Sequence, residues 1–221
     1  MAVFSSEDRA VAQQIVAKYP NARSATLPLL FLVQSIDGYV SEDGMREVAE
    51  ILGLTPAQVL ASASFYTMLK KRPQGEYLVS ICRNISCTHR GARRVIEAAE
   101  ETLGIETGET TSDGRFSLEA AECLGTCDGA PSMQINYEDF YDVTPDGVIE
   151  LILKVGRGEE VRSVRGEPVK TAKEIARETA LAGVRRDSED LVHAARTVGG
   201  ESIPTDMAPG FRPRVEGDED V

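Results

Sequence analysis

Apolar residues in the first seventy positions recur with the three-to-four-residue spacing of helices. Each predicted helix has a typical boundary residue: a serine or threonine at its start, a glycine or proline at its end, or both. Thr55, Pro56 and Gln58 mark one start, because threonine caps a helix, proline fits its first turn and glutamine completes a capping box. We therefore predict an N-terminal helical domain over residues 1–72. One helix is expected from Ser5 until Pro20 closes it, and a second from Pro28 to Asp37. A third is expected from Ser41 until Gly53 ends it, and a fourth from Thr55 onward.

The spacing of apolar residues shortens after residue 76. Residues 77–81 form an apolar run and residues 116–120 alternate, which predicts two strands with a helix over residues 91–103 between them. Met133, Ile135 and Tyr137, followed by residues 140–143, indicate a hairpin, and residues 145–156 a last helix. The order βαβ followed by ββα predicts an α/β (α+β) fold, a small sheet covered by helices in the thioredoxin-like layout. This second domain is expected over residues 73–156.

The pattern weakens beyond Gly156. Residues 171–182 are compatible with a helix, but glycines and prolines then interrupt the chain, and residues 216–220 are mostly acidic. We expect residues 157–221 to be an extended, partly irregular C-terminal extension, of which residues 157–214 lie over partner subunits and the acidic end is solvated.

Composition narrows the functional class. The chain has 221 residues, is 42% hydrophobic and carries a net charge of -12, which fits a soluble globular protein and disfavours nucleic acid as a partner. The longest apolar run, residues 27–33, is interrupted by Pro28 and is far shorter than the ~20 residues that cross a bilayer. The N-terminus shows no basic segment followed by an apolar core, so the reducing cytosol is the expected compartment and proteins are the expected partners.

The chain has four cysteines, in two close pairs that each follow a predicted strand. Cys82 and Cys87 form a C-x4-C pair, and Cys123 and Cys127 a C-x3-C pair. Soft thiolates at this spacing select zinc or an iron-sulfur cluster, whereas the reducing compartment argues against disulfides. Small residues between the cysteines leave backbone N–H groups free to point at sulfur, which suits cluster sulfides as well as thiolates. Spacing alone leaves zinc and [2Fe-2S] open.

A longer ordered set of motifs accompanies the cysteines and resembles a known family. The pieces occur in the order Phe65-Tyr66-Thr67-Met68, Cys82-x4-Cys87, Gly91-Ala92, Leu103-Gly104-Ile105, Gly108-Glu109-Thr110-Thr111, Glu122-Cys123-Leu124-Gly125-x-Cys127 and Ala130-Pro131. Together they resemble the thioredoxin-like [2Fe-2S] ferredoxin family, in particular its members that form the E subunit of NADH-quinone oxidoreductase, the bacterial respiratory complex I. The resemblance runs from about the first helix to Val155 and leaves the C-terminal extension outside.

The resemblance implies that Cys82 and Cys87 bind one iron of a [2Fe-2S] cluster, and that Cys123 and Cys127 bind the other. It further implies an electron-transfer subunit that accepts or stores electrons from FMN on a partner subunit, where NADH is also bound. Other peripheral-arm iron-sulfur subunits would be neighbours, on the cytoplasmic side of the cell membrane, without direct insertion of this chain. No complete active site is expected on this chain alone, and the cluster is expected off the main electron path.

Two alternatives remain at this stage. The equivalent small subunit of a soluble NAD-linked hydrogenase or formate dehydrogenase would carry the same motifs. A zinc-stapled interaction module would use the same four cysteines without redox chemistry. Arg83, Arg90, Arg93 and Arg94 lie near the first pair in sequence and are candidates for tuning the potential of a bound cluster.

Overall fold

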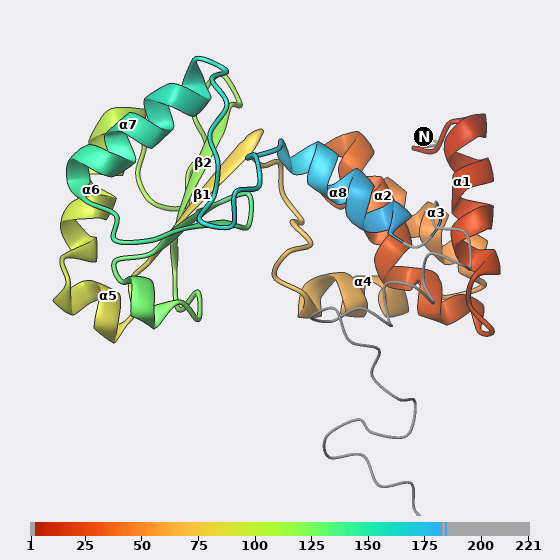
Figure 1. Ribbon diagram of the computed structural model, residues 1–221. Helices are drawn as coiled ribbons and strands as arrows, with labels where there is room; N and C mark the ends of the chain where they lie inside the picture. The colour runs from red at the N-terminus through yellow and green to blue at the C-terminus, as the bar shows by residue number, and fades with distance from the viewer. Residues whose placement is uncertain (1–2, 183, 185–221) are drawn as a thin grey trace, which may run out of the picture. The chain divides into compact units, whose positions relative to one another are not determined.

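The computed structural model describes residues 3–182 and 184, and its elements follow the predicted order (Figure 1). The described residues through Leu181 form one compact unit. The division at residues 72 and 156 stays a prediction. The first helices are α1 (Ser6–Ala17), η1 (Ala22–Ala25), α2 (Thr26–Asp37), α3 (Glu42–Leu52) and α4 (Pro56–Phe65). They are followed by β1 (Tyr77–Cys82), α5 (Ile85–His89), α6 (Ala92–Leu103), β2 (Phe116–Ala121), η2 (Cys127–Gly129), β3 (Met133–Ile135), β4 (Glu138–Phe140), α7 (Pro145–Gly156) and α8 (Ala172–Leu181).

The helix ends in the N-terminal part lie close to where the sequence predicts them. Ser5 caps α1 by accepting a hydrogen bond from the Asp8 N–H, and Thr55 and Gln58 form a complete capping box at α4. Gly38 ends α2 with a φ of 82°, in the left-handed region that glycine reaches without strain. Local sequence signals therefore set the boundaries of these helices.

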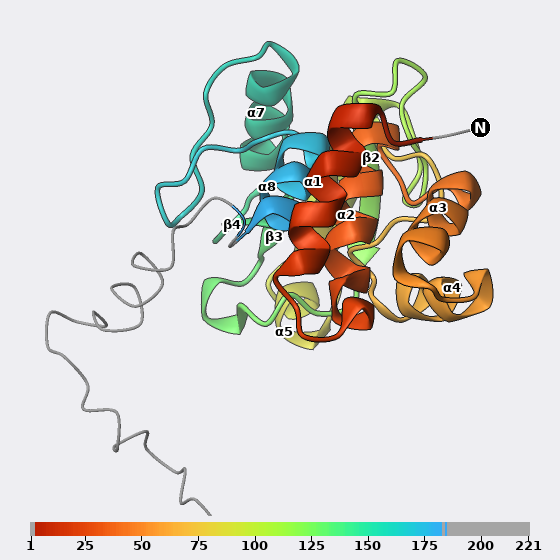
Figure 2. The same ribbon diagram turned by 90° about the vertical axis from the view of Figure 1, so that its right-hand side faces the viewer.

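Helix α2 is the centre of this part because it is apolar on almost every side. Leu29, Leu30 and Val33 are fully buried. Helix α8 packs against α2, as Figure 2 shows, although more than 130 residues separate the two in sequence. The Lys173 ammonium donates to the Ile36 carbonyl at 2.7 Å, and the Arg177 guanidinium pairs with Asp8 at 2.8 Å. The start of the C-terminal extension thus covers a helix of its own chain.

The sheet has the order β2-β1-β3-β4. β1 and β2 are parallel, β1 and β3 antiparallel, and β3 and β4 antiparallel. Helices α6 and α7 cover one face, where their apolar residues pack against those of β1, β2 and β3 (Figure 1). The predicted α/β (α+β) class and the βαβ-ββα order are confirmed. The core under α6 and α7 includes Val79, Ile81, Val95, Ala99, Leu118, Met133, Ile135, Val148, Ile152 and Val155.

The hairpin is shorter than its alternation predicts. β3 ends at Ile135, and Asn136 and Tyr137 have φ values of 49° and 71°, so both belong to the turn. The fully buried Asn136 side chain explains this turn. Its amide accepts from the Leu78 N–H at 2.8 Å and donates to the carbonyls of Glu76 and Lys170 at 2.9 and 2.8 Å. The amide therefore ties the hairpin to the segments that enter β1 and α8.

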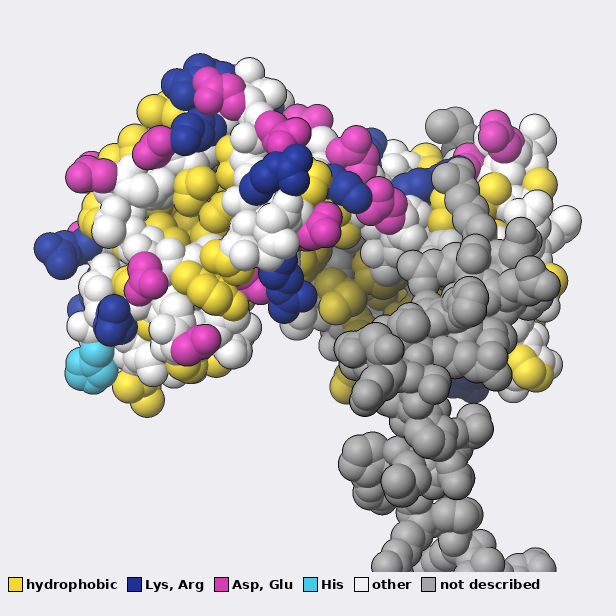
Figure 3. Space-filling model, in the orientation of Figure 1, with side chains coloured by type: hydrophobic (Ala, Val, Ile, Leu, Met, Phe, Trp, Pro, Cys, Tyr) yellow, Lys and Arg dark blue, Asp and Glu magenta, His cyan; other side chains and the backbone are white. Residues whose placement is uncertain are grey.

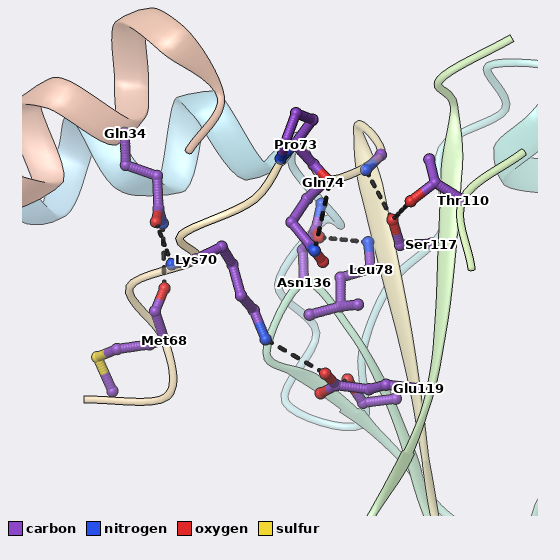
Figure 4. A network of polar contacts seen from close by, with 12 residues as sticks. Gln34, Met68, Lys70, Pro73, Gln74, Leu78, Thr110, Ser117, Glu119 and Asn136 are labelled. Atoms are coloured by element: carbon purple, nitrogen blue, oxygen red, sulfur yellow. Dashed lines mark hydrogen bonds and ion pairs between the residues drawn. The ribbon is translucent and has the colours of Figure 1, made fainter. Parts of the chain in front are cut away.

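The segment between α4 and β1 is held by side chains from both sides (Figure 4). Gln34 of α2 donates to the Met68 carbonyl at 3.1 Å and accepts from the Lys70 N–H at 2.8 Å. The Lys70 ammonium then reaches Glu119 of β2 at 3.2 Å. These bonds connect the last residues before the sheet to α2 and to β2.

No single helix within the described ranges is long and apolar enough to cross a membrane. Helices α3 and α4 reach that length and composition only as a pair, which is bent by 117°.

Candidate metal centre

The first cysteine pair is positioned by a strand and a short helix. Cys82 is the last residue of β1, and Cys87 lies within the short helix α5, for which the sequence analysis predicts no helix. Asn84 caps this helix by accepting from the Ile85 N–H at 2.7 Å, and the Thr88 hydroxyl donates to the Arg83 carbonyl at 2.7 Å. The two bonds close the chain around Cys87 into a compact turn, and Cys82 and Cys87 lie in the same buried cluster.

The surroundings of the first pair are apolar, with N–H groups directed at sulfur. Cys82 and Cys87 are 3% and 1% exposed and pack with Ala92 and Ala130. Burial raises the pKa of the Cys82 thiol, whereas hydrogen bonds from the N–H groups of Asn84 and Leu124 act in the opposite direction. Such donors stabilise a thiolate more than a neutral thiol. These N–H groups belong to the loops in which the sequence predicts such donors, and their role toward a bound cluster stays a prediction.

The loop that carries the second cysteine pair begins at the same edge of the sheet as the first pair. β1 and β2 are parallel and in register, with Cys82 opposite Ala121, and the Arg83 N–H donates to the Ala121 carbonyl at 2.9 Å. The chain that carries Cys123 and Cys127 therefore starts beside the first pair. Leu124 packs against the apolar cluster around Cys82 and Cys87, so this loop folds back toward them.

The thiols of the second pair are exposed, in contrast to the first. Gly125, with a φ of 77°, turns the loop so that its own N–H donates to the Cys123 sulfur at 3.4 Å. Cys127 opens the short helix η2. All four cysteines are free, so their thiols remain available for a metal. Within the part of the chain that the structure describes, no three side chains of His, Cys, Asp or Glu gather closely enough to hold a metal ion.

The donor set nevertheless fits a thiolate-bound cluster. Four thiols in two pairs are the ligands that [2Fe-2S] requires, and the two pairs are offered by neighbouring strand ends. The Thr126 hydroxyl, between the second pair, is shielded from solvent and has no hydrogen-bond partner in the protein. A buried hydroxyl without a partner is costly, and a sulfur ligand at this place would accept its hydrogen bond.

The arginines near the first pair differ in their surroundings. Arg83 forms an ion pair with Glu122, which precedes Cys123, and Arg90 lies 3.5 Å from Asp142. Arg93 and Arg94 stand exposed on the first turn of α6. On the face drawn in Figure 3, lysines and arginines are interspersed with acidic side chains rather than gathered into one patch.

Two hydroxyl residues near the sulfurs escaped the reasoning from sequence. Besides Thr126, Ser132 has its hydroxyl 3.6 Å from the Cys87 sulfur. A sequence signal for Ser132 exists, because it is the polar residue between Ala130-Pro131 and the buried strand β3. Its contact with a cysteine 45 positions earlier is visible only in the fold.

Comparison with known proteins identifies the family of this chain and several relatives. The family model described as thioredoxin-like [2Fe-2S] ferredoxin matches residues 12–156. The E subunit of NADH-quinone oxidoreductase from Mycobacterium tuberculosis is 40% identical over 194 residues, which cover 88% of this chain and 74% of the relative. NADH-quinone oxidoreductase subunit 2 of Thermus thermophilus is 36% identical over 152 residues, or 68% of this chain and 84% of the relative. Among solved structures, an NAD+-reducing [NiFe]-hydrogenase matches at 23% identity and a TM-score of 0.49, covering 52% of this chain and 20% of that chain. The chain belongs to the thioredoxin-like [2Fe-2S] ferredoxin family.

Proposed function

We propose that this chain binds one [2Fe-2S] cluster through Cys82, Cys87, Cys123 and Cys127. The observation that carries the proposal is the parallel register of β1 and β2, which starts both cysteine loops at one edge of the sheet. Four free thiols and the N–H groups directed at two of them support the assignment. Membership of a [2Fe-2S] ferredoxin family favours iron and sulfide over zinc.

We further propose that the chain is the electron-transfer subunit of the NADH dehydrogenase module of an NADH-quinone oxidoreductase. The relatives that support this are subunits named for that oxidoreductase. FMN and NADH would be bound by a partner subunit, other iron-sulfur subunits would lie nearby, and the module would stand on the cytoplasmic side of the membrane. The chain would then take part in the oxidoreductase reaction without a complete active site of its own.

The residues of this chain would supply the environment of the site. When bound, a [2Fe-2S] cluster supplies a one-electron acceptor. The N–H groups of Asn84 and Leu124 stabilise negative charge on Cys82, and Ala92 and Ala130 exclude water from the first pair. The exposed second pair keeps the site close to the surface, as electron exchange with a partner subunit requires.

Metal and sulfide analysis of anaerobically purified protein tests the first proposal. We expect about two irons and about two acid-labile sulfides per chain, brown colour, and an electron paramagnetic resonance signal on reduction. A colourless protein with bound zinc and without sulfide would contradict it and support the interaction module.

Copurifying subunits test the second proposal. A flavin subunit together with antiporter-like membrane proteins is expected, whereas a hydrogenase or formate dehydrogenase subunit would contradict it.

A further inference from the structure

Ser132 lies beside the first cysteine pair without being one of the ligands proposed above. Its side chain is 1% exposed, and its hydroxyl oxygen is 3.6 Å from the sulfur of Cys87, which is equally buried. This distance is within hydrogen-bonding range for sulfur. The hydroxyl therefore has its contact with Cys87 in a place that water does not reach.

The backbone fixes Ser132 in this position. Its carbonyl accepts from the Cys82 N–H at 3.1 Å, so the same residue contacts both cysteines of the first pair. On one side the carbonyl of Pro131 accepts from the Val143 N–H at 2.9 Å, and on the other Ser132 continues into β3, which pairs with β1. The hydroxyl is therefore held against Cys87 by the sheet rather than by a mobile loop.

The charge state of Cys87 decides the direction of the hydrogen bond. A thiol and a hydroxyl can each donate, but a thiolate can only accept. Once Cys87 is a metal ligand it is a thiolate, so the proton of the bond must come from Ser132. A donor to a charged acceptor forms a stronger bond than a neutral pair, more so in a site from which water is excluded.

Building on the proposed [2Fe-2S] site, we propose that Ser132 is a positioning residue that donates a hydrogen bond to the Cys87 thiolate and thereby raises the reduction potential of the site. Reduction adds one electron, supplied by the reduced flavin of the partner, and no proton, so the four-thiolate site gains one negative charge. A fixed donor stabilises the more negative state more strongly. Loss of the hydroxyl should therefore make reduction less favourable.

Redox titration of the loaded full-length protein measures this effect. We expect Ser132→Ala to lower the one-electron reduction constant about tenfold, a shift of ~59 mV to more negative potential. Ser132→Thr keeps a hydroxyl and should restore most of the difference. Ser163→Ala is a matched control, because Ser163 is also a buried serine but its hydroxyl contacts no cysteine.

A spectroscopic readout separates the hydrogen bond from a general effect on structure. Wild-type protein unfolded and reconstituted in D2O carries deuterium on the Ser132 hydroxyl. We expect its Fe–S(Cys) Raman bands to shift relative to protein reconstituted in H2O, and we expect Ser132→Ala to lose part of that shift. If Ser132→Ala does not retain a cluster, pulsed paramagnetic resonance of the reduced wild type decides. An exchangeable proton that is coupled to the site and does not belong to a backbone amide supports the proposal. If all coupled exchangeable protons belong to backbone amides, the proposal is overturned.

The outcomes distinguish this inference from the function on which it depends. If the wild-type protein contains no iron and no sulfide after reconstitution, both the proposed function and the role of Ser132 are overturned. If the loaded wild type and the loaded Ser132→Ala variant have equal reduction potentials and equal Raman shifts in D2O, only the role of Ser132 is overturned. A shift of the same size in Ser163→Ala would show a general effect of cavities and would overturn it as well.

Discussion

The two cysteine pairs begin at the same edge of the sheet and have very different surroundings. Cys82 and Cys87 are buried in a strand end and a short helix, whereas Cys123 and Cys127 are exposed in a loop turned by Gly125. The difference arises because Ala92 at the start of α6 and Ala130 pack with the first pair, whereas in the described part of the chain Cys123 and Cys127 belong to no such apolar cluster. The fold alone therefore positions the first pair, and on our proposal the bound cluster holds the second.

Substituting one cysteine from each pair tests this difference most strongly. We expect Cys87→Ala and Cys127→Ala both to abolish cluster binding, because each removes a proposed ligand. In the metal-free proteins we expect Cys87→Ala to lower the free energy of unfolding by about 1–2 kcal/mol, through a lost buried contact and an unpaired Ser132 hydroxyl. Cys127→Ala should change it by less than about 0.5 kcal/mol. Iron content and urea unfolding measure the two effects, and equal destabilisation by both variants would contradict the comparison.

Chemical modification of the metal-free protein gives a second measure of the same contrast. Iodoacetamide should alkylate Cys123 and Cys127 at least about ten times faster than Cys82 and Cys87, because a buried thiol reacts only when the structure opens locally. The raised pKa of Cys82 slows its reaction further, since the thiolate is the reactive form. Peptide mass spectrometry over time reports each pair separately. In urea the four rates should converge, and a difference that persists there would mean that burial is not its cause.

Thr126 offers a test in which the sign of the effect changes with cluster binding. Thr126→Val removes a buried hydroxyl without a partner, so the metal-free protein should gain about 1 kcal/mol in the free energy of unfolding. The loaded protein should release its cluster to a chelator faster, because the hydroxyl would no longer donate to sulfur. Ser163→Ala is the control, since it removes another unpartnered buried hydroxyl remote from the cysteines in sequence. Unchanged cluster release in Thr126→Val would show that this hydroxyl does not serve the site.

The sequence predicts features that neighbouring residues determine and misses features that distant residues determine. Helix ends at Ser5, Gly38 and Thr55 follow from residues next to each other in the chain, so local chemistry is enough to predict them. Asn136 is different, because its turn is fixed by hydrogen bonds to Glu76, Leu78 and Lys170, which are distant in sequence. Alternation of apolar residues therefore extended the strand too far.

For the site, spacing identified the four cysteines and the strands that precede them. It did not predict that Cys87 lies in a helix, because α5 spans five residues and is too short to show a helical pattern. Nor could it predict Ser132, whose contact with Cys87 requires β3 to lie beside β1. The packing of α8 against α2 was missed for the same reason, since it joins distant parts of the chain.

The smallest effect that we expect is the coupling energy of the ion pair between Arg83 and Glu122. Arg83 follows Cys82 and Glu122 precedes Cys123, so this pair is a direct link between the two loops. Both side chains are exposed, and we expect a coupling energy below about 1 kcal/mol that falls as salt is added. A double-mutant cycle with Arg83→Gln and Glu122→Gln, measured by urea unfolding of the metal-free protein, gives this value. Glu150 and Lys154, an exposed pair on α7, provide the reference cycle. A coupling well above that reference would mean that the second loop is already held by the protein, because an exposed pair gains much energy only where its side chains are fixed beforehand.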